Sequence, residues 1–184
     1  MRASSSPRLA VALACAALVA SLGCAGEPAR NLTEAEKRQR IEAMYAEYRD
    51  EFPRVEAIGP AELAAELAAE TGGDEGLVVV DARSDEERAV STIPGAIPRQ
   101  EFERRSDDLA GHDVVTYCTI GYRSGLYAQE LVERGFRARN LAGSILAWTH
   151  EGLPLVTPEG EPTRRVHVYG ERWNLAAEGY EAVW

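Results

Sequence analysis

The sequence predicts an α/β fold in which one parallel sheet is flanked by helices. Two apolar runs, at residues 77–80 and 114–117, have the continuous composition of strands buried on both faces rather than an alternating pattern. Helical segments are predicted between and after these runs, and strands that alternate with helices form parallel sheets. The 184 residues also predict an N-terminal helix and an aromatic C-terminal extension around this single domain.

Residues 1–23 predict a signal peptide. Two arginines precede an apolar run at residues 9–22, which is too short to span a membrane but typical of a signal h-region. Residues 21–24 are similar to a bacterial lipobox, with Ser21 where leucine is usual, so Cys24 is the predicted site of lipid attachment. Ordinary signal cleavage nearby is the alternative. In either case we expect export, and a lipid anchor would hold the protein at the periplasmic or outer-surface face of the cell envelope.

The composition restricts the classes of partner. With 30 acidic and 20 basic side chains, the chain has a formal net charge of −10. An acidic surface argues against binding to nucleic acid or to an anionic lipid surface. The histidines, at positions 112, 150 and 167, lack the spacing of metal ligands, so we expect no metal and no cofactor.

We expect residues 24–52 to form a tether and a helix. Thr33 and Glu36 have the spacing of a capping box, and the helix should continue to about residue 50, before Pro53. Its apolar face is most simply packed on the domain, with partner binding as the alternative. That face consists of Ile41, Met44, Tyr45 and Tyr48.

The predicted domain covers residues 53–157. Its elements alternate along the chain, with a break at the glycine pair 72–73 and a helix end at Gly135. The predicted strands are 55–58, 77–80, 114–117 and 138–141. The predicted helices are 61–69, a surface helix at 100–105, and one after the loop that ends at Arg123, which is indicated by the helical spacing of Leu126, Tyr127, Leu131 and Val132.

Cys118 lies where the strand 114–117 turns into the following helix. The free N–H groups and the positive dipole end of that helix favour an anion, and therefore favour the thiolate over the thiol. Arg123 adds a fixed positive charge at the end of the same loop. In open parallel sheets ligands bind beyond the carboxyl ends of the strands. The sequence therefore indicates a reactive thiol, and a small buried cysteine is the alternative.

The segment 114–125 resembles the active-site loop of the rhodanese, or sulfurtransferase, family. Four further segments resemble other motifs of that family in the same order, across about 100 residues. They are the strand ending in Asp-x-Arg (77–83), the Pro-Gly turn (93–97), the closing helix (140–148) and its exit (152–155). Two positions depart from the pattern: Ser91-Thr92 stand where Gly-His is usual, and Ala142 stands where the first of two glycines is usual.

The resemblance implies a sulfurtransferase that carries sulfane sulfur as a persulfide on Cys118. A small donor, thiosulfate or a persulfide, and a thiol acceptor are the implied partners. Asp81 and Arg83 are expected to support the site rather than to react. The substrate-binding residues, through their loop amides, would be Thr119, Ile120, Gly121, Tyr122 and Arg123.

Arg123 is the cation that an anionic donor would meet in a loop without lysine. A thiol-borne persulfide is therefore an alternative to thiosulfate. We expect Arg123→Ala to leave the fold intact and to weaken anionic donors by about 1.5–3 kcal/mol, the range for a charged hydrogen bond.

Two other functions are alternatives to sulfur transfer. Tyrosine-type phosphatases have a similar loop with one residue more, Cys-x5-Arg, which would hold a phosphate, whereas this loop is Cys-x4-Arg. A membrane-tethered rhodanese-like module that binds or senses sulfur, or binds a protein of the envelope, is the second alternative.

Residues 158–184 are too aromatic to be disordered. We interpret them as a cover on the sheet or on the active face, with a separate partner site as the alternative.

Overall fold

The computed structural model describes residues 32–69 and 76–184. The predicted signal peptide, the lipid attachment site at Cys24 and the break at residues 72–73 lie outside these ranges. No helix within the described ranges is long and apolar enough to cross a membrane.

The α/β fold is confirmed. The central sheet has five parallel strands in the order β1-β5-β4-β2-β3. Its strands are β1 (Glu56–Ile58), β2 (Leu77–Asp81), β3 (Ile97–Pro98), β4 (Asp113–Tyr117) and β5 (Arg137–Leu141). The helices of the described chain are α1 (Glu34–Tyr48), α2 (Pro60–Ala69), α3 (Asp85–Val90), α4 (Arg99–Arg104), α5 (Tyr122–Glu133) and α6 (Ser144–His150).

The two central strands are buried on both faces, as the sequence predicts. Val79 and Val115 belong to one apolar cluster, whereas Val80 and Val114 belong to the other. Successive residues of a strand point to opposite faces, so the alternation places one cluster on each side of the sheet. The first cluster includes residues of α2 and α6, and the second includes residues of α4 and α5.

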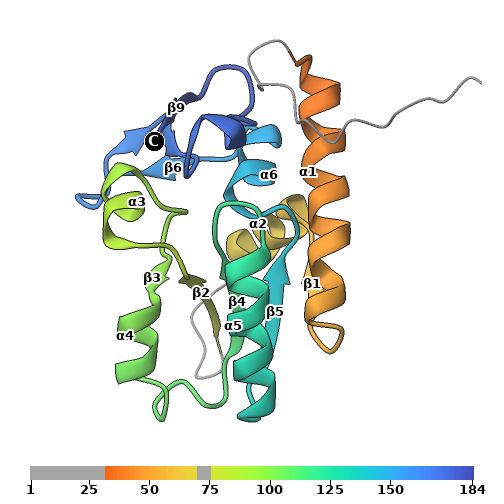
Figure 1. Cartoon of the computed structure of the whole chain (residues 1–184). Helices are drawn as coiled ribbons and strands as arrows, with labels where there is room; N and C mark the ends of the chain where they lie inside the picture. The colour runs from red at the N-terminus through yellow and green to blue at the C-terminus, as the bar shows by residue number, and fades with distance from the viewer. Residues whose placement is uncertain (1–31, 70–75) are drawn as a thin grey trace, which may run out of the picture.

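The N-terminal helix begins and packs as predicted. The Thr33 hydroxyl accepts from the Glu36 amide, and the Glu36 carboxylate accepts from the Thr33 amide, which completes the capping box. Ile41 and Tyr45 on the predicted face are buried. The helix ends at Tyr48 and is followed by a 3-10 turn at Arg49–Glu51, so it is slightly shorter than predicted. Figure 1 shows α1 running along the side of the domain next to α6.

Three elements differ from the prediction. Helix α3 and strand β3 were not predicted, although Ser84 and Glu87 form a capping box at the start of α3. Helix α4 spans Arg99–Arg104, and it is not wholly a surface helix because Phe102 is fully buried.

The C-terminal extension is ordered and forms small elements of its own. It contains β7 (Pro162–Thr163), β8 (Arg165–His167), a 3-10 turn at Glu171–Trp173 and β9 (Glu181–Val183). Strand β7 pairs with β6 (Leu155–Val156), and β8 pairs with β9. Figure 1 shows these segments in blue, gathered at the end of the domain near α3 and α6. Because parallel strands β2 and β4 also point their carboxyl ends toward α3 and α6, the extension lies over the predicted active face.

Candidate active site

Cys118 follows β4 directly, at the carboxyl end of the sheet, and its residue is 2% exposed. Its amide donates to the Ser144 hydroxyl at 3.0 Å. The amides of Ile145 and Leu146, in the first turn of α6, donate to the carbonyls of Cys118 and Thr119. Helix α6 therefore fixes the backbone of the cysteine from one side, while α5 begins on the other.

The sulfur of Cys118 accepts a hydrogen bond from the Gly121 amide at 3.2 Å. This contact is one of those predicted for the loop amides. Burial opposes ionisation of the thiol, but hydrogen bonds from the Ser124 side chain, the charge of Arg123 and the Ser124 and Gly121 amides together lower the pKa of Cys118. Ser124 was missed by the sequence argument, which ended the loop at Arg123.

Ser124 has a second partner that limits its role. Its hydroxyl donates to the Asn140 side-chain oxygen at 2.7 Å, and a hydroxyl has one proton to donate. The Asn140 amide in turn donates to the Gly121 carbonyl at 2.8 Å. Asn140, in β5, therefore holds the loop and competes with the thiolate for the Ser124 proton.

Gly121 allows the loop to turn and the N-terminal helix to approach it. It has a φ of +110°, which residues with a side chain rarely adopt. A Cβ atom at this position would lie 2.6 Å from the ring of Tyr45 in α1. Close to it, a Cβ at Gly125 would lie 2.3 Å from the ring of Phe52. The N-terminal segment is thus packed directly against the reactive loop.

The guanidinium of Arg123 is paired with a carboxylate that the sequence argument missed. It makes two hydrogen bonds to Glu87 in α3, both at 2.7 Å, and a third to the Thr119 hydroxyl at 3.1 Å. Burial alone would raise the pKa of Glu87, but the Arg123 guanidinium and the Ser84 amide lower it to about 2. Arg123 is therefore not the free cation that the sequence predicts, because Glu87 neutralises its charge.

Asp81 and Arg83 form a buried pair at the end of β2. Arg83 donates to both carboxylate oxygens of Asp81, and also to the Ser91 carbonyl at 2.6 Å. The hydroxyl of Tyr117 donates to Asp81 at 2.5 Å, and it accepts from the Ile93 amide. These bonds connect the residue before Cys118 to the Pro-Gly turn. The supporting role expected for both residues stays a prediction.

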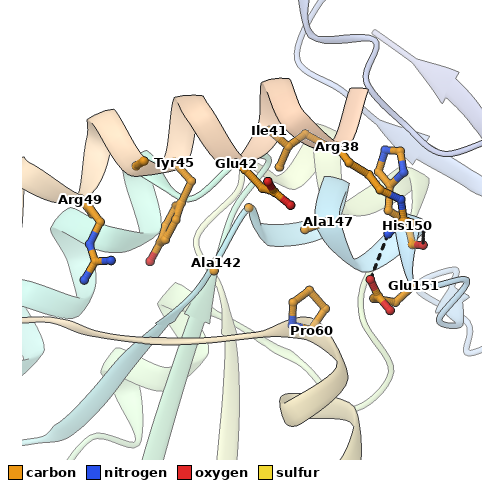
Figure 2. A pocket seen from close by; sticks show the side chains of 12 residues that line it. Arg38, Ile41, Glu42, Tyr45, Arg49, Pro60, Ala142, Ala147, His150 and Glu151 are labelled. Atoms are coloured by element: carbon orange, nitrogen blue, oxygen red, sulfur yellow. Dashed lines mark hydrogen bonds and ion pairs between the residues drawn. The ribbon is translucent and has the colours of Figure 1, made fainter. Parts of the chain in front are cut away.

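A second pocket lies apart from this centre, between α1 and α6. Figure 2 shows Tyr45 and Ile41 reaching into it from α1, with Ala147 and His150 on α6 opposite. It has a volume of about 300 Å³. Arg38 pairs across it with Glu151 at 3.1 Å and also donates to the His150 carbonyl. None of the residues predicted for the site lines this pocket.

The pocket above Cys118 has a volume of about 410 Å³ and contains most of the predicted loop. Thr119, Ile120, Tyr122 and Arg123 line it together with the cysteine. Three residues outside the predicted loop complete the lining: Tyr48, Tyr169 and Trp173. The sequence predicts order and a covering position for the extension, but no local pattern indicates that it meets α1 at this pocket.

The domain is a parallel α/β fold with a cysteine at a strand-to-helix turn, in surroundings that lower the thiol pKa, and this arrangement is typical of proteins whose cysteine is a nucleophile or a thiolate ligand. Comparison with known proteins assigns the family. The rhodanese-like domain matches residues 63–151. A protein of Allochromatium vinosum named sulfurtransferase is 39% identical over 90 residues, which cover 47% of this chain and 84% of that protein. The chain belongs to the rhodanese-like family.

Two further proteins are similar to this chain. Thiosulfate sulfurtransferase 18 of Arabidopsis thaliana is 34% identical over 77 residues, which cover 40% of this chain and 57% of that protein. The crystal structure of a thiosulfate sulfurtransferase from Pseudomonas aeruginosa has a TM-score of 0.53 and 24% identity. The match covers 66% of this chain and 23% of that one, and it supports the fold.

The lowered pKa of Cys118 leads to a direct prediction. The rate of alkylation against pH should give a midpoint below the reference value of about 8.5 for a free thiol. Ser124→Ala should raise the midpoint to the extent that the hydroxyl donates to the thiolate rather than to Asn140. The same protein in denaturant is the control and should titrate at the reference value. A native midpoint at or above that value would contradict the electrostatic account.

Proposed function

We propose that this protein is a sulfurtransferase that moves sulfane sulfur through a persulfide on Cys118. The observation that carries the proposal is the Gly121 amide directed at the Cys118 sulfur, in a loop whose surroundings lower the thiol pKa. The thiolate is the nucleophilic form of cysteine and a lowered pKa favours it, and the same amide would stabilise the charge on the outer sulfur of a persulfide. Membership of the rhodanese-like family supports this chemistry.

The reaction divides into two displacements at sulfur. In the first, the Cys118 thiolate attacks the outer sulfur of the donor, a new S–S bond forms, and the donor's S–S bond breaks with its electron pair going to the leaving group. In the second, an acceptor thiolate attacks the outer sulfur of the enzyme persulfide and regenerates the Cys118 thiolate. No net oxidation or reduction of the enzyme occurs, so the cycle needs no redox cofactor.

Intact mass tests the first step. Reduced protein treated with a sulfane-sulfur donor should gain about 32 Da, and cyanide or a reducing thiol should remove the gain. A phosphatase assay on the same protein should give no turnover, because the Cys-x4-Arg loop is one residue shorter than the phosphatase loop. If folded, reduced protein gains no sulfur from thiosulfate or from glutathione persulfide, the enzyme proposal fails, and a sulfur-binding or partner-binding module takes its place.

We further propose that the protein is exported and held at the cell envelope by a lipid on Cys24. The support is the short apolar run followed by the lipobox-like residues 21–24. Membrane fractionation with metabolic lipid labelling should place the label and the protein in the membrane fraction. Cys24→Ser should release the protein and abolish the label. A wild-type protein that is unlabelled and found in the soluble fraction would leave ordinary secretion as the explanation.

A further inference from the structure

The pocket above Cys118 has an aromatic entrance, which we define as Tyr48, Tyr122, Tyr169 and Trp173. Tyr48 comes from α1 and Tyr122 from the start of α5, and their ring centroids are 5.1 Å apart. Tyr169 and Trp173 come from the C-terminal extension, and their rings meet edge to face at 6.4 Å. All four side chains line the same pocket. Three of the four rings therefore come from opposite ends of the described chain, one from α1 and two from the extension.

Tyr169 has an unfavourable backbone conformation, and its side chain lies at the entrance. Its φ is +69°, a left-handed conformation that a tyrosine rarely adopts, and its amide donates to the His167 ring. The ring lies over the Arg123 guanidinium, with 5.4 Å between the guanidinium carbon and the ring centroid. Tyr169 is nevertheless 63% exposed. Strain that is kept without burying the ring is typical of a position with a functional role.

The charges around the sulfur disfavour a dianion. Glu87 neutralises Arg123, so the thiolate, the guanidinium and the carboxylate together carry a net charge of −1. Thiosulfate, which carries two negative charges, would enter a pocket with mostly apolar walls, where the exposed Arg172 beside Trp173 is a further cation near the entrance. An organic group offers the aromatic entrance the contacts that a hydrated inorganic ion lacks.

We propose that the aromatic entrance binds the organic group of the sulfur donor, and that the protein prefers sulfane sulfur carried on an apolar or aromatic group over inorganic thiosulfate. The inference rests on the proposed sulfurtransferase function and specifies its substrate class. With an organic thiosulfonate, the Cys118 thiolate takes the outer sulfur and an organic sulfinate leaves with the electron pair of the broken S–S bond. The charge is −2 before and after the step, and the sulfinate's organic group is the part that the rings would contact.

Two donors of equal charge test the proposal. Methanethiosulfonate and benzenethiosulfonate have the same reacting group and the same charge. The charge of the exposed Arg172, beside Trp173, should therefore affect both donors alike. We define the normalised ratio as the rate of persulfide formation on Cys118 with benzenethiosulfonate over that with methanethiosulfonate, divided by the same ratio for free cysteine. This normalised ratio should be at least about ten. Thiosulfate should be slower than either. A normalised ratio near one would overturn the proposal.

Variants of the entrance identify the residues responsible. Trp173→Ala should reduce the normalised ratio at least about fivefold. Tyr169→Gly is a second variant in case the loss of Trp173 disturbs the fold, because glycine adopts a positive φ without strain and the removed ring is largely exposed. Trp184→Ala is the matched control: Trp184 is 58% exposed in the same extension, lies outside the pocket, and should leave the ratio unchanged. Ratios that do not distinguish these variants would contradict the assignment.

A binding measurement separates failure of this inference from failure of the proposed function. Calorimetry on Cys118→Ser should detect benzenesulfinate, the product, more tightly than methanesulfinate, and Trp173→Ala in the same background should remove the difference. If no donor transfers sulfur but this binding pattern holds, the aromatic site stands and the sulfurtransferase proposal fails. If sulfur is transferred at equal normalised rates and neither sulfinate is preferred, the inference fails alone.

Discussion

Replacement of Cys118 by serine is expected to abolish both the sulfur adduct and turnover. A serine oxygen cannot hold a persulfide, and Cys118 is the free cysteine among the described residues. The loss should reach the background rate, a decrease of roughly 10³-fold or more, as for other covalent nucleophiles. Intact mass and a steady-state sulfur-transfer assay on the same preparation measure both effects.

The serine variant must remain folded for this result to count. The side chain is small, buried and of similar shape, so the thermal midpoint should stay close to that of the wild type. An adduct of about 32 Da on the folded serine variant would place the sulfur on another residue and remove Cys118 from the mechanism.

Arg123→Ala is expected to have a large effect on stability as well as on sulfur transfer. Sequence reasoning expects the fold to tolerate this change, but the structure places Glu87 in a buried position where Arg123 is its partner. Removal of the partly exposed guanidinium leaves the buried carboxylate with the Thr119 hydroxyl and the Ser84 amide as donors, and costs about 1.5–3 kcal/mol, the range for hydrogen bonds to a charged group. The free energy of unfolding at pH 7, measured in urea, should fall by this amount.

The pH dependence gives the sign of the Glu87 contribution. In the wild type its pKa is about 2 in the folded state against 4.5 as the ordinary value. The hydrogen bonds and charges around Glu87, those of Arg123 among them, together contribute about 3 kcal/mol that is present above pH 4.5 and is lost as the pH falls toward 2. In Arg123→Ala burial is opposed less strongly, so acid should neutralise Glu87 at a higher pH and reduce the difference from wild type.

A surface ion pair supplies the control for this experiment. Arg105 and Glu101 are partly exposed and 3.0 Å apart on one helix face, so Arg105→Ala should cost less than about 1 kcal/mol. If Arg123→Ala costs no more than Arg105→Ala, the pair with Glu87 does not stabilise the site in the way described here.

The core of the fold and the reactive cysteine could be predicted because each depends on local sequence. The runs at residues 77–80 and 114–117 are apolar on both faces, and Cys118 follows one of them directly. Helix α3 could not be recognised by apolar periodicity because its six residues are mostly charged. The capping box at Ser84 and Glu87 was the available signal for its start.

The partner of Arg123 depends on tertiary structure and not on local sequence. Glu87 and Arg123 are separated by 36 positions, and they meet because β2 and β4 are neighbours in the sheet and both end at the same edge. For the same reason, the sequence predicts an extension that covers the sheet or the active face, but not that Tyr169 lies over Arg123. The pairing of β8 with β9 and the unusual φ of Tyr169 bring its ring to Arg123.

The contact between Gly121 and Tyr45 decides which residues a truncated or chimeric protein must include to keep the Cys118 loop packed. Residues 63–151, which match the family, include the cysteine and its loop but not the ring behind the loop. A chimera built on those boundaries would contain Cys118 and its loop but would lack α1, which packs against Gly121. A fragment that keeps the packing of the loop should therefore begin at α1, upstream of the residues that match the family.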